Sequence, residues 1–416
     1  MAGAPRRCVR RSRRRRTRVR RRGRLLAVGL PLRLPYPRGF RGGRVILDLF
    51  AGPGGWAQGL RELGAFDVGI EWDEAACATR LAAGHATLRA DIAAHPVGPF
   101  LDHVSGLIAS PPCQAWSTAG KRLGLLDQGL VHQAVDDLSR GIDSRQRLLT
   151  ACQDERSLLA AEPMRYLHAL HTHAGRPGWV VMEEVPDVLA LWKQYAQILR
   201  GWGFSVWVGL VNAADYGIPQ TRRRAILIAS RTRSAIPPEP THAAAAQPPS
   251  LFGPGRDRWV SMAQALGWDT DATVNTRGRR RGNGGNEFGV ERPSWALTGT
   301  SRSWVLRSNS QAHAAIRRLD EPAPTLFFGH RANESRWEAA DHGGLHRVAS
   351  IAPRSPDLRL TIAQAGVLQT FPADYPWQGG RSRVFEQIGN AVPPALARHL
   401  LAPHVPTVRE DLDLAA

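Results

Sequence analysis

The chain has 416 residues, 43% of them hydrophobic, with 55 Lys and Arg against 36 Asp and Glu and a formal net charge of +19. This size and apolar content suffice for a large globular domain with a smaller one beside it. No run of about 18 apolar residues occurs, which excludes a transmembrane helix. Four cysteines without a CxxC pair exclude a disulfide scaffold and a cysteine-rich zinc site. We therefore expect no membrane partner, no metal and a reducing, cytoplasmic location.

The positive charge is concentrated at the N-terminus. Residues 1–44 hold 17 Arg and no acid, so the rest of the chain is nearly neutral at +2. Such a segment cannot bury a core, and it predicts either a nucleic-acid-binding arm or a disordered leader. Only two Lys stand against 53 Arg, which is typical of a GC-rich genome where untranslated codons read as Arg. Translation from Val28 or Val45 is therefore a further interpretation. A secretory signal fits less well, because its apolar stretch, residues 25–34, is short and interrupted.

The first predicted unit is a strand, a glycine turn and a helix. Residues 45–50 form a short apolar run, residues 51–55 are rich in Gly, and a helical pattern follows through Trp56, Leu60 and Leu63. Glycines in such a turn let a ligand approach the backbone at a helix N-terminus. The unit predicts a cofactor site.

Acidic residues follow at the ends of later predicted strands. Residues 67–71 end in Glu71, at the spacing from the glycines where an acid binds ribose hydroxyls in nucleotide sites. Asp91 follows the next extended segment and suits an adenine amino group. Each acid alone is equally well explained as a helix cap or a loop residue, but their ordered series is not. The chain contains no GxxxxGK[ST] motif, which argues against a phosphate-binding loop.

A cysteine loop follows another predicted strand at residues 104–109. Residues 110–117 place two prolines directly before Cys113, which predicts a rigid loop at a strand end. A rigid loop suits a nucleophile that must be held in one place. A lone cysteine is more often a small buried hydrophobe, which fits Cys77 and Cys152 but not the polar surroundings of Cys113.

Together these segments resemble the bacterial-type C5-cytosine-specific DNA methyltransferase family. Residues 48–55 resemble the family's first motif, which binds S-adenosylmethionine, and residues 111–117 resemble its catalytic fourth motif. The other matches, in the family's order, are 71–72, 91–92, 154–159 (weak), 179–185, 220–224, 359–361 with 368–372, and 387–394. The resemblance runs from about residue 45 to residue 400.

The resemblance implies an enzyme that transfers a methyl group from S-adenosylmethionine to C5 of cytosine in a short specific sequence of duplex DNA. Cys113 would add to C6 of the base, Glu183 would protonate N3, and Arg222 and Arg224 would lie by the base, with Arg224 preferred for O2. The target base must flip out, because this chemistry cannot occur inside a stacked duplex. We further expect a nucleoid-associated monomer, with a restriction endonuclease as a separate partner.

The resemblance also implies the binding residues. Phe50 and Trp72 would contact adenine, Glu71 would hold ribose, Asp91 would bind the adenine amino group, and Asn390 would close the pocket. The full set expected at the cofactor is Phe50, Gly52, Gly54, Gly55, Glu71, Trp72, Asp91, Ile92, Pro111, Leu159 and Asn390. The set expected at the substrate is Gln114, Ser117, Gln220, Arg277 and Arg279.

The fold class implied is α/β, with a Rossmann-like S-adenosylmethionine-dependent methyltransferase sheet and a second, smaller target-recognition domain. Residues 44–230 and 373–416 would form the catalytic and cofactor-binding domain, and residues 231–372 the target-recognition domain. Residues 231–358 lack a regular rhythm and carry a net charge of +5, which suits contact with a polyanion. Residues 1–44 would remain a basic arm.

Two features depart from the family pattern. Glu184 stands where the family usually has Asn, which puts a second carboxylate beside Glu183. Residues 123–153 are longer than a short member needs, and their acids and arginines predict a mobile surface loop. Two alternatives stay open: an RNA cytosine-5 methyltransferase, and a catalytically impaired DNA-binding protein on the same scaffold. An amino methyltransferase is disfavoured, because it would carry an aromatic residue where this chain has Cys113.

Overall fold

The computed structural model of the chain describes most of the sequence from residue 44 to residue 405. The described ranges are 44–116, 123–173, 176–251, 253–267, 291–297 and 360–405, with the backbone of 272–275, 305–307 and 337–339. Residues 1–43, Ser117, Arg277 and Arg279 lie outside them. None of the helices in the described part has the length and apolarity needed to cross a bilayer.

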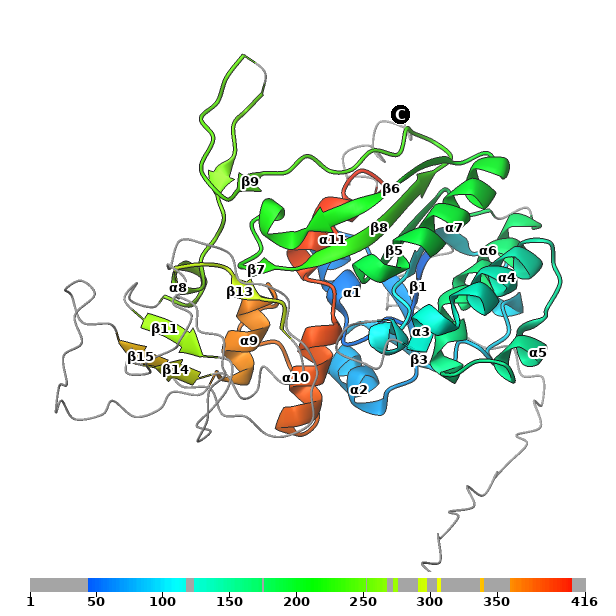
Figure 1. Cartoon of the computed structure of the whole chain (residues 1–416), viewed down its shortest axis with the longest axis horizontal. Coiled ribbons are helices and arrows are strands. Elements are labelled where there is room, and N and C mark those ends of the chain that lie inside the picture. The colour runs from blue at the N-terminus through cyan, green and yellow to red at the C-terminus, as the bar shows by residue number, and fades with distance from the viewer. Residues whose placement is uncertain are drawn as a thin grey trace, which may run out of the picture. The chain divides into compact units, whose positions relative to one another are not determined.

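A seven-stranded sheet organises the large part of the molecule (Figure 1). Its strands are, in spatial order, β3 (Ala86–Arg89), β2 (Asp67–Glu71), β1 (Val45–Leu49), β4 (Val104–Ala109), β5 (Trp179–Glu184), β8 (Arg223–Ser230) and β6 (Ser205–Asn212). The first five run parallel, and β8 is antiparallel to both β5 and β6. Chain order reverses between β1 and β4, and ligands of such sheets bind at the carboxyl ends beside this reversal. The predicted Rossmann-like α/β class is confirmed.

Successive strand residues point into two different cores, because side chains alternate across a sheet. Leu47 and Leu107 belong to a core that includes residues of α4 (Gln128–Ser139), α6 (Glu162–His171) and α7 (Leu189–Gly201). Their neighbours Ile46 and Ile108 belong to a second core, with residues of α1 (Gly55–Glu62) and α11 (Pro394–Leu401). Helices therefore cover both faces, and the central strands are buried on each side.

The shorter helices complete this part of the chain. The α-helix α2 (Glu74–Ala82) follows β2 and is capped by the Asp73 carboxylate, which accepts from the N–H of Ala76 at 2.9 Å. The 3-10 helices are η1 (Gly98–Phe100), η2 (Cys113–Ala115), η3 (Glu155–Ala161), η4 (Pro186–Val188) and η5 (Ala213–Tyr216).

The expectation of a mobile surface loop over residues 123–153 is wrong. This stretch forms α3 (Leu123–Leu126), α4 and α5 (Arg145–Leu149). On α4 the side chains of Val131, Ala134, Val135 and Leu138 are buried in the first core. Their spacing is that of one helical face, a signal that was outweighed by the acids and arginines within residues 123–153.

A third core joins later segments of the chain. It contains residues of α8 (Met262–Leu266), α9 (Ile362–Leu368) and α10 (Arg381–Asn390), together with Trp295 of β13 (Ser294–Trp295). Strand β13 pairs in parallel with β7 (Gln220–Thr221). Short strands also occur where the sequence shows no regular rhythm: β9 (His242–Ala243) pairs with β10 (Asp257–Arg258), and β11 (Ala272–Asn275) pairs with β14 (Val305–Arg307) and β15 (Trp337–Ala339). The division into two domains at 230/231 and 372/373 stays a prediction.

Candidate active site

The glycine-rich turn joins β1 to α1 at the carboxyl end of the sheet. Phe50 has a φ of 61° and Gly52 a φ of 54°, both in the left-handed region. For Phe50 this conformation costs on the order of 1 kcal/mol or more, and such strain is concentrated at ligand sites. A Cβ placed on Gly52 would meet nothing within 4 Å. The backbone of Gly52 is therefore open to an approaching ligand.

The next two glycines of the turn leave no room for a side chain. A Cβ on Gly54 would lie 2.8 Å from the Tyr375 hydroxyl, and one on Gly55 would collide with the carbonyl oxygen of Val392. Tyr375 also donates a hydrogen bond to the carbonyl of Pro53 at 2.6 Å. These glycines let the C-terminal part of the chain pack directly against the turn, and their expected contact with the cofactor stays a prediction.

Glu71 is fixed to the same turn. Its Oε2 accepts from the N–H of Gly52 at 2.8 Å, and its Oε1 accepts from the N–H groups of Trp72 and Asp73 at 2.7 Å each. A carboxylate has more lone pairs than these three donors use, so it can still accept from a hydroxyl. The Trp72 ring beside it is 70% exposed, which leaves a face for an aromatic ligand.

The remaining residues expected at the cofactor differ in exposure. Oδ1 of the half-buried Asp91 accepts from a backbone N–H two residues further on at 3.0 Å. Ile92 and Pro111 are buried, Leu159 on η3 is half-buried, and Asn390 is exposed at the end of α10.

Arg80 stabilises the glycine turn through a hydrogen bond, and sequence reasoning missed this residue. This fully buried residue of α2 lies 2.7 Å from Asp67 and 3.7 Å from Asp48, and it donates to the carbonyl of Ala51 at 3.3 Å. Burial raises the pKa of Asp48 well above its ordinary value, and Asp67 adds to the rise while Arg80 opposes it. A signal was present, because Arg80 shares a helical face with the buried Ala76.

The cysteine loop leaves β4 beside this turn. The Ser110 hydroxyl accepts a hydrogen bond from the indole N–H of Trp56 on α1 at 2.9 Å. The Ser110 N–H donates to the carbonyl oxygen of Leu49 at 3.2 Å. After the two prolines, Cys113 and Gln114 lie in the short helix η2, and both are half-buried. Burial raises the pKa of the Cys113 thiol to about 12, with Glu184 as the next contributor. The free protein therefore holds Cys113 as a thiol.

The end of β5 and the start of β8 bring acid and base groups to Cys113. Arg224 Nε lies 3.0 Å and Arg222 Nη2 3.6 Å from Oε1 of the buried Glu183. Arg222 also donates to the carbonyl of Gly389 at 2.7 Å, which ties the cluster to α10. All four residues predicted as catalytic therefore belong to one cluster, since both arginines and Glu183 also influence the Cys113 thiol.

Gln220 has a structural partner. The residue is fully buried, and its amide donates to the side-chain oxygen of Gln369. Gln369 in turn donates to the carbonyl of Ala391 at 2.6 Å. Gln220 and Gln369 thus hold the start of β7, the end of α9 and the residue after α10 together.

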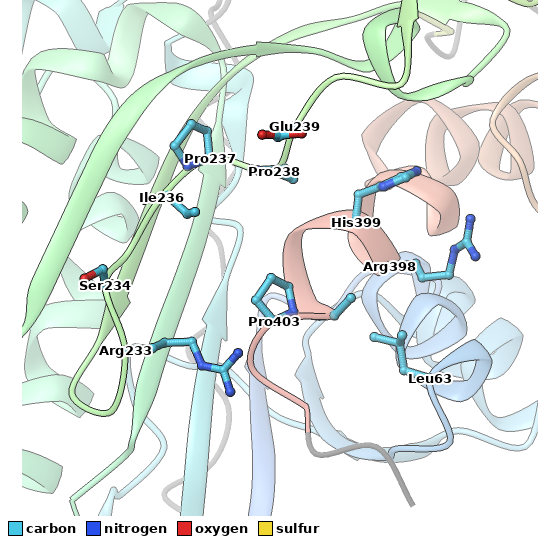
Figure 2. A pocket seen from close by; sticks show the side chains of 11 residues that line it. Leu63, Arg233, Ser234, Ile236, Pro237, Pro238, Glu239, Arg398, His399 and Pro403 are labelled. Atoms are coloured by element: carbon cyan, nitrogen blue, oxygen red, sulfur yellow. The ribbon is translucent and has the colours of Figure 1, made fainter. Parts of the chain in front are cut away.

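A surface hollow of about 570 Å³ lies apart from this cluster (Figure 2). The residues that line it come from the end of α1, from α11 and the turn after it, and from the segment after β8: Leu63, Arg233, Ser234, Ile236, Pro237, Pro238, Glu239, Arg398, His399, Ala402 and Pro403. No residue of the Cys113 cluster or of the glycine turn lines it, so it is not the candidate active site.

Comparison with known families decides the identity. The model of the family described as C-5 cytosine-specific DNA methylase matches residues 45–135 and 144–405. The chain belongs to this family. It is therefore an enzyme, a DNA (cytosine-5-)-methyltransferase, and the resemblance inferred from its motifs is confirmed.

Two curated relatives of this methylase come from bacteria. It is 26% identical over 364 residues to the type II methyltransferase M.AplI of Arthrospira platensis, covering 85% of this chain and 83% of that protein. It is 27% identical to the type II methyltransferase M.XorII of Xanthomonas oryzae pv. oryzae, covering 85% and 82%. Both are methyltransferases of the restriction–modification kind.

The fold of this methylase has solved relatives as well. The crystal structure of the S. pombe Dnmt2 methyltransferase superposes with a TM-score of 0.50 at 11% identity, covering 86% of this chain and 99% of that one. At this identity the likeness shows the shared fold, a mixed sheet with helices on both faces.

Proposed function

We propose that this methylase transfers a methyl group from S-adenosylmethionine to C5 of a cytosine flipped out of a short specific site in duplex DNA, through a covalent bond between Cys113 and C6. The observation that supports this most is the cluster at the ends of β4 and β5 and the start of β8. There a cysteine on a rigid loop, the Glu183 carboxyl group and two arginines gather in a buried setting.

The residues at the glycine turn fit S-adenosylmethionine. The backbone at Gly52 is open, Glu71 retains acceptor capacity for ribose hydroxyls, and Trp72 offers an exposed ring to adenine. When bound, S-adenosylmethionine supplies an electrophilic methyl group.

The chain's own residues would activate the base. Cytosine C5 is a weak nucleophile until the Cys113 thiolate adds to C6, which moves the C5–C6 π electrons into an enamine spanning C4 and C5. Glu183 gives a proton to N3 during this addition, so that no negative charge develops on the ring. Arg224, which also orients Glu183, is assigned to O2 of the base.

The bond to Cys113 must then be broken. Once C5 carries the methyl group, a base removes the C5 proton, the freed electron pair restores the C5–C6 double bond, and the thiolate leaves C6. The proton on N3 returns to Glu183. Cys113 leaves as the thiolate that attacked and regains from solvent the proton that its thiol lost before the attack, and Glu183 again holds the proton that it gave to N3.

Recognition of DNA is assigned to residues 231–372, with Arg277 and Arg279 as contacts to guanine in the major groove. Gln114 and Ser117, which follow Cys113 in the sequence, are assigned to the flipped nucleotide. Gln220 is assigned to positioning, because its amide already holds Gln369. We further propose that the enzyme acts as a monomer, alongside a separate restriction endonuclease.

The decisive experiment is transfer of a labelled methyl group from S-adenosylmethionine to unmethylated duplex DNA, with Cys113→Ser in parallel. Bisulfite sequencing of the product should find conversion-resistant cytosines in one short context, and these should be absent with the variant. Labelled RNA together with unlabelled DNA would show that the substrate is RNA and not DNA. Binding of DNA without label in either would favour the impaired DNA-binding protein.

A further inference from the structure

Glu184 is the residue at which this chain departs from the family's usual Asn. It is the last residue of β5 and is 2% exposed. Its Oε2 accepts a hydrogen bond from the N–H of Val185. Its Oε1 is buried and has no hydrogen-bond partner among the described residues. One oxygen of this carboxyl group therefore accepts a hydrogen bond, and the other has no partner among the described residues.

The titratable and charged groups that act on Glu184 come from three elements. They are Glu183 on the same strand, Arg224 on β8 with Arg222 just before that strand, and Cys113 on η2. Both guanidinium groups are engaged with Glu183, at 3.0 and 3.6 Å. Within the described part of the chain, no cation lies within ion-pair distance of Glu184.

This setting disfavours a charge on Glu184. A buried carboxylate that lacks a cation and lies beside a second carboxylate is costly, and such a group keeps its proton instead. Burial raises the pKa of Glu184 well above 4.5, and Glu183 adds to the rise, while the Val185 N–H and the two arginines oppose it.

Glu184 lies on the same face of β5 as Met182, and Cys113 packs against the core to which Met182 belongs. After burial, Glu184 contributes more than any other charge to the raised pKa of Cys113, ahead of Glu183, whereas the two arginines lower it. An ionised Glu184 would oppose the Cys113 thiolate. A neutral Glu184 removes that opposition and has an O–H to donate.

We propose that Glu184 is a positioning residue that works as a neutral carboxylic acid: its Oε2 accepts the Val185 N–H, and its Oε1 holds an O–H that is free to donate to the Cys113 thiolate once that thiolate forms. In this form it supplies the acceptor and donor of an Asn amide. Its ionisation at alkaline pH removes the donor, places a charge beside the thiolate and disables Cys113. The inference rests on the proposed function in taking Cys113 as the nucleophile.

Infrared difference spectra test the protonation state directly. The full-length wild-type protein at neutral pH is compared with Glu184→Gln, and with Glu184→Asn as a second variant in case the first does not fold. The wild type should show the C=O band of a protonated carboxyl group that both variants lack. An ionised carboxylate band in its place would overturn the proposal.

Alkylation of Cys113 by iodoacetamide across a pH series tests the link to the thiol, with Cys113→Ser giving the background from the other cysteines. The ratio of the Glu184→Gln rate to the wild-type rate should rise about tenfold or more with pH, as Glu184 loses its proton, which corresponds to a change of about one unit in the pKa of the thiol. A ratio that is the same at every pH would refute the coupling. Neither readout needs DNA or S-adenosylmethionine. The proposed function fails on a different result, methyl transfer by Cys113→Ser.

Discussion

The hydroxyl of Tyr375 donates to the carbonyl oxygen of Pro53 at 2.6 Å, across 322 positions of the chain. Pro53 lies in the glycine turn after β1, and Tyr375 lies in the segment between α9 and α10. The turn that is assigned to the cofactor is thus held by a segment that follows the predicted target-recognition region. This contact links the shape of the glycine turn to the C-terminal part of the fold.

Replacing Tyr375 by Phe should weaken binding of S-adenosylmethionine. The change removes one buried hydrogen bond, worth roughly 0.5–1.5 kcal/mol, and releases the carbonyl that shapes the turn. We expect the Kd, measured by isothermal titration calorimetry, to rise about three- to tenfold. Tyr216→Phe is the matched control, because the Tyr216 hydroxyl donates to the carbonyl of Pro238 at 2.9 Å, in a segment that carries no residue of the turn. Equal weakening by both variants would contradict the assignment.

Two glycines of the turn should respond differently to alanine. Gly55→Ala brings a Cβ onto the Val392 carbonyl, so it should lower the free energy of unfolding by about 1–3 kcal/mol. Gly52→Ala has open space but a φ of 54°, so its stability loss should be no more than about 1–2 kcal/mol. Its main effect should be on the affinity for S-adenosylmethionine. Urea unfolding measures the stability of both variants, and calorimetry measures their affinity for S-adenosylmethionine. A larger stability loss in Gly52→Ala and a larger affinity loss in Gly55→Ala would contradict these roles of the two glycines.

Arg80→Met should destabilise the protein strongly. The substitution leaves Asp48 and Asp67 buried without their cation, and breaking a buried pair from one side costs about 3–5 kcal/mol. Adding Asp67→Asn should recover part of that loss in urea unfolding, because one of the stranded charges is then removed. Arg89→Met is the control, since Arg89 pairs with Glu74 at 3.0 Å on the surface, where ion pairs contribute about 0–1 kcal/mol. A loss of similar size in both variants would contradict the structural role of Arg80.

The sequence was sufficient wherever the evidence is local. Strand β2 ends at Glu71 as predicted, and Cys113 follows β4 on its proline loop, because strand patterns and their terminal residues are contiguous in the chain. The ion pair of Arg80 with Asp67 depends on how α2 folds back onto β2, and no local pattern specifies it. The hydrogen bond from Tyr375 to Pro53 joins residues that are 322 positions apart, and no local sequence pattern predicts it. Helix α4 is an intermediate case. Its apolar periodicity predicts a helix, but the charged residues within 123–153 favoured a surface loop in the sequence analysis.

His85 should make the stability of the fold depend on pH. It is 7% exposed, its Nδ1 lies 3.1 Å from Arg61 Nη2, and its Nε2 is buried without a hydrogen-bond partner among the described residues. Burial lowers the pKa of His85 from 6.5 to about 3, and the positive charge of Arg80 adds to this. Between these two values the unfolded chain binds a proton at this position that the folded chain does not, so the free energy of unfolding falls as pH falls.

The expected contribution of His85 is at most about 1.4 kcal/mol per pH unit within that window, or roughly 2 kcal/mol between pH 6.5 and pH 5. Urea unfolding of the wild type and of His85→Gln over this range measures it, and the variant should lose that part of the slope. His173→Gln is the matched control, because His173 is exposed. If His85→Gln kept the full wild-type slope while His173→Gln reduced it, the acid sensitivity would belong to the surface. If only His85→Gln flattened the slope, protonation of the His85 imidazole, which packs against the glycine turn, would be the source of the acid sensitivity.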